Sequence, residues 1–165
     1  MTFWYYANLS VHVLVAMLWL GGMFFLGAVG APVLRTVEPA AMRQRLFQEL
    51  GLRFRTVGWW SIAVLVGTGV INLHFRGWLT WDGALGSSAF WGTGAGIALA
   101  IKLVAVTLMV GVSWIHDFVL GPRASMAAAG TGSAIALRRR AMLVARANAL
   151  LGVILVAAAL RLARG

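Results

Sequence analysis

Cysteine is absent from this chain of 165 residues, and acidic residues are scarce, with Asp and Glu together numbering four. The absence of cysteine excludes disulfides, thiolate metal sites and cysteine nucleophiles. Because none of the four carboxylates lies deep in an apolar segment, hydrolytic or acid–base catalysis is poorly supported. No glycine loop follows a predicted strand, so a phosphate site is not expected either. The chemistry that remains depends on histidine, methionine and basic side chains.

The composition that is present belongs to a membrane protein. Hydrophobic residues make up 61% of the chain and charged residues 11%, and the mean hydropathy is +0.88. These values lie outside the range of soluble domains. The net charge of +10 does not predict a nucleic-acid partner, because the arginines lie between apolar segments and serve as topology signals. We expect the main partner of the chain to be the lipid bilayer.

Four apolar segments are long enough to cross a bilayer, for which about 20 residues suffice. The predicted fold class is therefore all-α, an integral membrane four-helix bundle, with residues 1–165 forming a single transmembrane domain. The first segment lacks a basic region before it, so we expect a retained helix rather than a signal peptide. The predicted spans cover about residues 3–29, 57–73, 93–120 and 141–162.

The connection between the first two spans is rich in arginine. Between Arg35 and Arg55, apolar residues such as Leu46 and Phe47 recur at helical spacing among the basic side chains. This pattern predicts a basic amphipathic surface helix between the first two spans.

The distribution of arginine also predicts the topology. The first and third connections are arginine-rich, whereas the second has Arg76 alone together with three tryptophans. By the positive-inside rule, the first and third connections face the cytoplasm, and both termini and the tryptophan-rich loop are outside. Arg161 and Arg164 oppose this assignment. We therefore expect a multi-pass protein of the inner, cytoplasmic membrane, with Gly83 external and the Ala124–Ala134 stretch cytoplasmic.

Lys102 is the only lysine, and it lies in the middle of an apolar run. An ionisable group at mid-bilayer costs about 2.5–3.5 kcal/mol on insertion scales, so it usually has a partner or a function. Met109 and His116 follow it at intervals of seven residues, which places all three on one helix face. An alternative is that Lys102 extends along its stem towards the membrane surface.

The predicted topology sorts the polar residues into two layers. His12 lies within the apolar first span, where its ring needs a partner inside the protein. His74 could instead be an ordinary interfacial residue, and His116 with Asp117 could be a structural pair at a helix end. The outer layer contains His12, Asn72, His74 and Lys102, and the inner layer contains His116, Asp117, Arg146 and Asn148.

Small residues permit close approach along the same helices. Gly92 and Gly96 form a Gly-xxx-Gly pair, which usually indicates helix packing. His12, Trp19 and Met23 share a helix face near further glycines. A flat cofactor between helices needs the same space, so both interpretations are open at this point.

Several motifs resemble a known membrane family. His12, the run Trp19-Leu20-Gly21-Gly22-Met23-Phe24, the run Gly67-Thr68-Gly69 and Lys102-Leu103 together resemble the copper-resistance D (CopD) family. The chain is also similar to the HemJ-type protoporphyrinogen oxidases, four-helix proteins associated with b-type haem. That resemblance implies roles for His12, Lys102, His116, Arg146 and Asn148. Ala149 stands where an acidic residue is expected, which departs from the HemJ pattern.

Histidine and methionine suit haem iron or copper(I), and haem propionates also need cations. The sequence favours an integral membrane b-type haem protein with a redox or electron-transfer role, which as an enzyme would be a haem-dependent oxidoreductase. The alternatives are a copper-binding or copper-transport protein and a structural or assembly subunit. Candidate partners are a quinone, a porphyrin, a membrane redox protein and a second copy. The candidate cofactor residues are His12, His74, Lys102, His116, Arg146 and Asn148; the histidines would ligate haem iron, and Met23 and Met109 would ligate copper.

Overall fold

The computed structural model describes residues 3–126 and 132–164, and within these ranges all regular structure is helical. The chain divides into two compact units, Met1–Ser87 and Ser88–Gly165, which are described separately. The all-α prediction is confirmed. Part of the predicted cytoplasmic Ala124–Ala134 stretch, residues 127–131, lies outside the described residues. The single transmembrane domain predicted for the whole chain stays a prediction.

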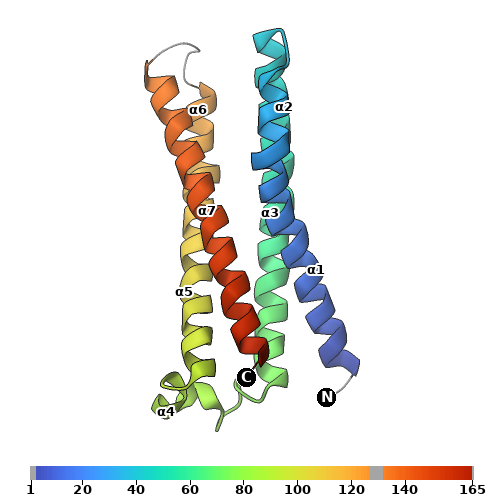
Figure 1. Ribbon diagram of the computed structural model, residues 1–165, viewed down its shortest axis with the longest axis vertical. Helices are drawn as coiled ribbons and strands as arrows, with labels where there is room; N and C mark the ends of the chain where they lie inside the picture. Colours follow the sequence, from blue (N-terminus) through green and yellow to red (C-terminus); the bar gives the residue numbers. More distant parts are fainter. Residues whose placement is uncertain (1–2, 127–131, 165) are drawn as a thin grey trace. The chain divides into compact units, whose positions relative to one another are not determined.

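Unit 1 is a helical hairpin. Its first arm is continuous from Phe3 to Arg35 and consists of α1 (Phe3–Phe25), the π-helical turn η1 (Leu26–Gly30) and α2 (Ala31–Arg35). The second arm is α3 (Ala40–Phe75), which runs antiparallel to α1 and packs against it (Figure 1). Each arm is about 50 Å long at 1.5 Å per residue. The hairpin can therefore cross a bilayer and extend beyond its apolar core.

Unit 2 is a second helical hairpin. The short helices η2 (Ala84–Gly86), which ends unit 1, and α4 (Ser88–Trp91) precede it. Its first arm consists of α5 (Gly94–Trp114), η3 (Ile115–Leu120) and α6 (Gly121–Met126), and its second arm is α7 (Gly132–Arg164), which packs against α5. Thr93 caps α5, because its Oγ1 accepts a hydrogen bond of 3.1 Å from the backbone N–H of Gly96.

Each first arm contains a π-helical turn immediately before an X-Pro pair. The backbone N–H of Ala31 donates to the carbonyl of Leu26, and that of Gly121 donates to the carbonyl of His116. Pro32 and Pro122 follow. Proline has no N–H, and its ring collides with the carbonyl four residues earlier in an ordinary α-helix. The wider π turn separates these groups, so each arm continues as a helix past its proline.

The two units have the same arrangement of helices, and the residue numbers of corresponding positions differ by 90. Pro32 corresponds to Pro122, and η1 to the last five residues of η3. Buried positions correspond as well, although the residue types differ. The buried pairs are Trp19 with Met109, Gly58 with Asn148, Ile62 with Gly152, and Thr68 with Ala158. We conclude that the chain contains two copies of one hairpin architecture.

The four predicted spans are confirmed as four long apolar helical segments. The structure places them at Phe3–Arg35, Ala40–Phe75, Gly94–Arg123 and Ile135–Ala163. Each is longer than the apolar run from which it was predicted, because polar turns at the ends of the spans are also helical. Sequence hydropathy detects the part of a helix that suits lipid and not the ends of the helix.

The arginine-rich connector differs from its prediction as a separate surface helix. It is helical from Ala40, but it continues without a break into the second span as the N-terminal half of α3. The physical reason is that this segment has no proline after Pro39 and its one glycine, Gly51, is tolerated inside a helix at a cost of about 1 kcal/mol. A continuous helix cannot both lie on the membrane surface and cross the membrane.

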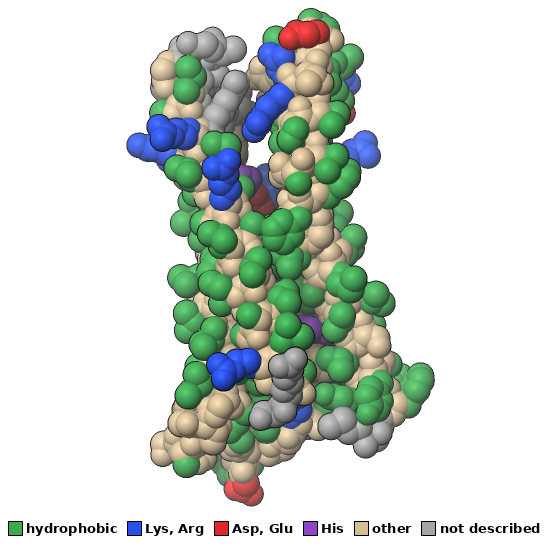
Figure 2. Space-filling model, viewed as in Figure 1, with side chains coloured by type: hydrophobic (Ala, Val, Ile, Leu, Met, Phe, Trp, Pro, Cys, Tyr) green, Lys and Arg blue, Asp and Glu red, His purple; other side chains and the backbone are tan. Residues whose placement is uncertain are grey.

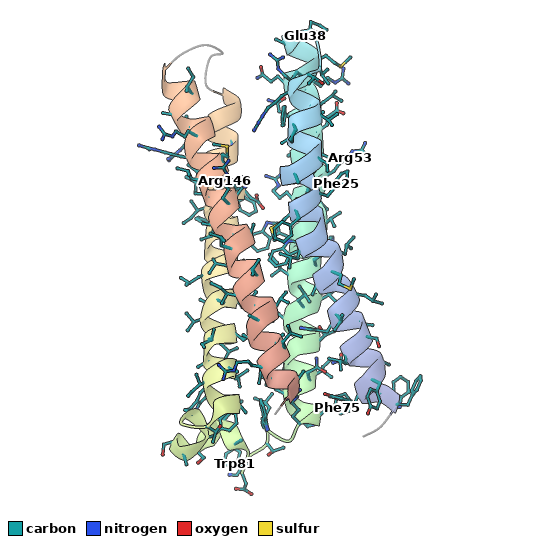
Figure 3. The ribbon with its side chains drawn as sticks, in the orientation of Figure 1. Phe25, Glu38, Arg53, Phe75, Trp81 and Arg146 are labelled. Carbon is teal, nitrogen blue, oxygen red and sulfur yellow. The ribbon has the colours of Figure 1, made fainter. Side chains whose placement is uncertain are left out.

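The surface of the helices suits a lipid environment. Many large apolar side chains are exposed along both units, among them Leu14, Trp60, Val104 and Leu150. In Figure 2, hydrophobic side chains cover much of the helices, and in unit 1 basic side chains gather near the end at which Figure 3 labels Glu38. Figure 3 places Trp81 at the opposite end of unit 1, beyond Phe75. This arrangement matches an apolar middle with polar and aromatic ends.

The Gly92 and Gly96 pair does not form a helix-packing stripe. Gly92 precedes α5, and only Gly96 lies within it. A Cβ added to Gly96 would collide with the carbonyl oxygen of Phe90 and come within 2.8 Å of the Trp91 Cα. Gly96 therefore allows α4 to fold back against the start of α5.

Candidate metal-binding site

His12 has a fixed orientation on α1. Its Nδ1 lies 2.7 Å from the hydroxyl oxygen of Thr68 on α3, and Thr68 is buried. The Thr68 hydroxyl also lies 2.7 Å from the carbonyl of Val64 and 3.3 Å from that of Leu65. When it donates its single hydrogen to these carbonyls, it accepts a hydrogen bond from His12. In that arrangement of hydrogens, neutral His12 carries its proton on Nδ1 and its lone pair on Nε2. This is the tautomer in which Nε2 can ligate a metal.

Two asparagines extend this arrangement into a polar cluster of Asn8, His12, Thr68 and Asn72. The side-chain amide of Asn8 donates to the Thr68 carbonyl at 3.0 Å and to Asn72 Oδ1 at 2.8 Å. The imidazole also lies beside Gly69 of α3, where an added Cβ would make an ordinary contact of 3.7 Å with His12 Cε1. The cluster joins α1 to α3 and holds the histidine between them.

The sequence predicts His12 and Asn72 as members of a polar layer, but it does not single out Asn8 and Thr68 as their partners. Asn8 lies one helical turn before His12, so it falls on the same face of α1. Thr68 stands between two glycines in a motif that had been noted only for its family resemblance. Both signals were visible in the sequence, but the antiparallel register that brings them together was not.

His74 lies in the same unit but outside the polar cluster. It is exposed near the end of α3, with its ring centroid 6.5 Å from that of Phe75. It follows Thr68 by six residues, which corresponds to about 9 Å along the helix. Its role as a second ligand stays a prediction.

Gly22, next to Met23, and Gly58 lie against aromatic side chains, and the role of Met23 as a copper ligand stays a prediction. A Cβ on Gly22 would come within 2.6 Å of the Phe54 ring, and one on Gly58 would lie 3.4 Å from Trp19 Nε1. Aromatic side chains thus occupy the space that a flat cofactor would need there. Met23 follows His12 by eleven residues, about 16 Å along α1. Met23 would therefore ligate a different ion from one bound by His12.

The remaining predicted residues lie in unit 2. Met109 is buried, with 3% of its surface exposed, which identifies it as a core residue of that unit. Lys102 is half-buried on α5. Arg146 is exposed on α7, as Figure 3 shows. Their predicted cofactor roles stay predictions.

The inner layer separates into two local interactions. His116 Nδ1 lies 2.9 Å from Asp117 Oδ1 within η3, and the predicted role of His116 as a ligand stays a prediction. Asn148 donates to Ser113 Oγ at 3.0 Å in a buried contact between α7 and α5. Ser113 had not been singled out in the sequence. Asn148 thus has a clear role in joining the helices of unit 2.

The donor set limits what the site can bind. Among the described residues, no three or more His, Cys, Asp or Glu side chains lie together as a metal-binding group. A metal ion at His12 would therefore take its other ligands from thioethers, carbonyls or a porphyrin. The residues fit a soft metal ion or a haem better than a zinc site, which usually has three or four such side chains.

Comparisons with known proteins identify a family. The family described as copper resistance protein D matches residues 48–160, which include Thr68, Lys102 and His116 but not His12. An uncharacterized protein of Aquifex aeolicus is 40% identical over 67 residues, 40% of this chain and 46% of its own length. The match thus spans less than half of that relative. No solved structure matches the chain. Since the family match covers 113 of 165 residues, the chain belongs to the copper resistance protein D family.

Proposed function

We propose that this membrane protein binds copper and that Nε2 of His12 is one of the ligands. The observation that carries this proposal is the hydrogen bond from His12 Nδ1 to Thr68, which orients Nε2 for coordination. Membership of a family described by copper resistance supports copper as the metal. Copper is then the cargo of the protein rather than a resident cofactor.

The chemistry of copper(I) fits the residue types that the chain contains. Copper(I) prefers imidazole and thioether ligands, and the chain has three histidines and seven methionines but no cysteine. The described residues contain no group of three or more His, Cys, Asp or Glu side chains. The other copper ligands would therefore be groups such as methionine thioethers or backbone carbonyls.

A b-type haem with a redox role, which the sequence had favoured, is the second candidate. One observation supports it: haem iron needs only one or two protein ligands, because the porphyrin supplies four nitrogens. A lone oriented histidine such as His12 therefore suffices. The quinone, porphyrin and redox partners predicted from the sequence belong to this candidate.

An absorption spectrum of the purified protein, combined with metal analysis, separates the candidates. We expect bound copper without a Soret band. A Soret band together with bound iron would contradict the copper proposal and support haem. If the protein shows no Soret band and binds no copper after copper loading, both proposals are wrong and a structural or assembly subunit is favoured.

We also propose that both termini and the tryptophan-rich loop lie outside the cytoplasm, in the inner membrane. Because the chain has no cysteine, single cysteines can report on this directly. In intact cells, Ser87→Cys should react with a membrane-impermeant maleimide, whereas Thr36→Cys should react only after lysis. Both positions are exposed, so accessibility within the protein does not differ. The opposite labelling pattern would invert the topology.

A further inference from the structure

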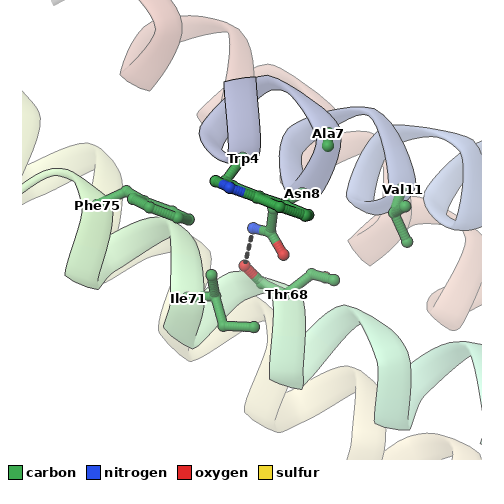
Figure 4. Close-up of a pocket in the computed structure, with 7 residues that line it drawn as sticks. All are labelled: Trp4, Ala7, Asn8, Val11, Thr68, Ile71 and Phe75. Atoms are coloured by element: carbon green, nitrogen blue, oxygen red, sulfur yellow. Dashed lines mark hydrogen bonds between the residues drawn. The ribbon is translucent and has the colours of Figure 1, made fainter. Parts of the chain in front are cut away.

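A groove in unit 1 lies directly beside the polar cluster. It has a volume of about 440 Å³, which is within the range of small-molecule sites. Figure 4 shows residues of α1 facing residues of α3 across it. The aromatic side chains of Trp4 and Phe75, the polar Asn8 and Thr68, and the apolar Ala7, Val11 and Ile71 line the groove.

The hydrogen bonds within the groove determine which donor and acceptor atoms remain available to a ligand. Both hydrogens of the Asn8 amide are used, one on the Thr68 carbonyl and one on Asn72 Oδ1. The Thr68 hydroxyl donates its hydrogen to Val64. Asn8 therefore has only Oδ1 left for a ligand, and a carbonyl oxygen can only accept a hydrogen bond. A matching ligand must bring a donor.

The corresponding place in unit 2 provides an internal comparison. A smaller cavity of about 90 Å³ is lined by Gly94, Ile97, Ala98, Ile101 and Arg161. These residues correspond to Trp4, Ala7, Asn8, Val11 and Ile71 with the same shift of 90 residues. Thr68 corresponds to the buried Ala158. The two hairpins thus repeat the groove, but only unit 1 combines its larger volume with an aromatic wall and an amide acceptor.

We propose that the groove of unit 1 binds an amphipathic ring that carries a hydroxyl group, such as the head group of a lipid-soluble hydroquinone. Trp4 and Phe75 provide aromatic surfaces for the ring, and Asn8 Oδ1 accepts the hydroxyl hydrogen. An alkyl chain would fill the apolar part equally well but would leave Asn8 Oδ1 without a donor. This binding does not depend on copper at His12.

The test compares decylubiquinol with decylubiquinone, which have the same tail but differ in hydroxyl donors. Each is titrated into the purified protein in detergent and followed by calorimetry. We expect decylubiquinol to bind about tenfold more tightly, the effect of one hydrogen bond in a water-poor site. Asn8→Ala, which copies the residue of unit 2, should abolish this preference. Thr107→Ala, an exposed hydroxyl bonded within its own helix, serves as the control.

A second variant keeps the proposal testable if Asn8→Ala fails to fold. Trp4 is exposed, so Trp4→Leu should fold normally and weaken the binding of both compounds. Equal binding of the two forms, unaffected by Asn8→Ala, would show that the groove holds only the alkyl tail and would overturn the proposal. Absence of binding by either compound would overturn it as well.

Discussion

Replacing His12 with alanine should remove essentially all high-affinity copper from the purified protein. The alanine variant has no imidazole at the point where α1 and α3 meet, and the described residues contain no cluster of other histidines or carboxylates to replace it. The change should leave the fold intact, because His12 is only half-buried and its partner Thr68 keeps its own bond to Val64.

A milder change at the same place should have an intermediate effect. Thr68→Val removes the acceptor that holds the His12 proton on Nδ1 but leaves the imidazole present. Loss of such an orienting partner typically costs 10–100-fold in metal affinity.

Copper(I) affinities are measured by competition with a coloured chelator. His116→Ala, in unit 2, serves as the matched histidine control and should retain the wild-type affinity. If His12→Ala keeps its full complement while His116→Ala loses it, the site lies at His116.

The second large effect concerns stability. Gly96→Ala should destabilise the protein by about 1–3 kcal/mol, because the added methyl group collides with the backbone of Phe90 and Trp91. Alanine is favoured over glycine inside a helix by about 1 kcal/mol. The collision should outweigh this gain, since backbone atoms cannot move aside as a flexible side chain can.

Gly92→Ala is the matched control, because the added Cβ would lie 3.5 Å from the carbonyl oxygen of Ala89, an ordinary contact. Thermal unfolding in detergent, followed by circular dichroism, compares the two variants with the wild type. A Gly96→Ala variant as stable as the wild type would show that α4 does not fold back on α5 as described.

The comparison of sequence and structure shows which features hydropathy can predict. Four spans and an all-helical fold followed from apolar runs of sufficient length. The continuity of α3 did not, since the arginine-rich half of this helix differs in composition from its apolar half while sharing one uninterrupted backbone. Composition indicates the environment of a segment, whereas helix breaks depend on local backbone chemistry.

The repeat of the hairpin was hidden for a related reason. Corresponding buried positions carry different residues, such as Trp19 with Met109 and Thr68 with Ala158. Only the π turns before Pro32 and Pro122 mark the register clearly, and a π turn cannot be read from apolar periodicity.

The site was predictable in part. His12 stood out because an imidazole within an apolar span needs a partner. Asn8 and Thr68 did not, because small polar residues in membrane helices are common and their pairing depends on the register between two helices. Gly22 was associated with a flat cofactor but accommodates the Phe54 ring.

X-ray absorption at the copper edge of the copper(I)-loaded protein tests the central claim most directly. We expect the spectrum of the wild type to contain an imidazole nitrogen at about 2 Å from copper, and this signal should disappear in His12→Ala. An identical imidazole contribution in the wild type and in His12→Ala would contradict the assignment of His12 as a copper ligand.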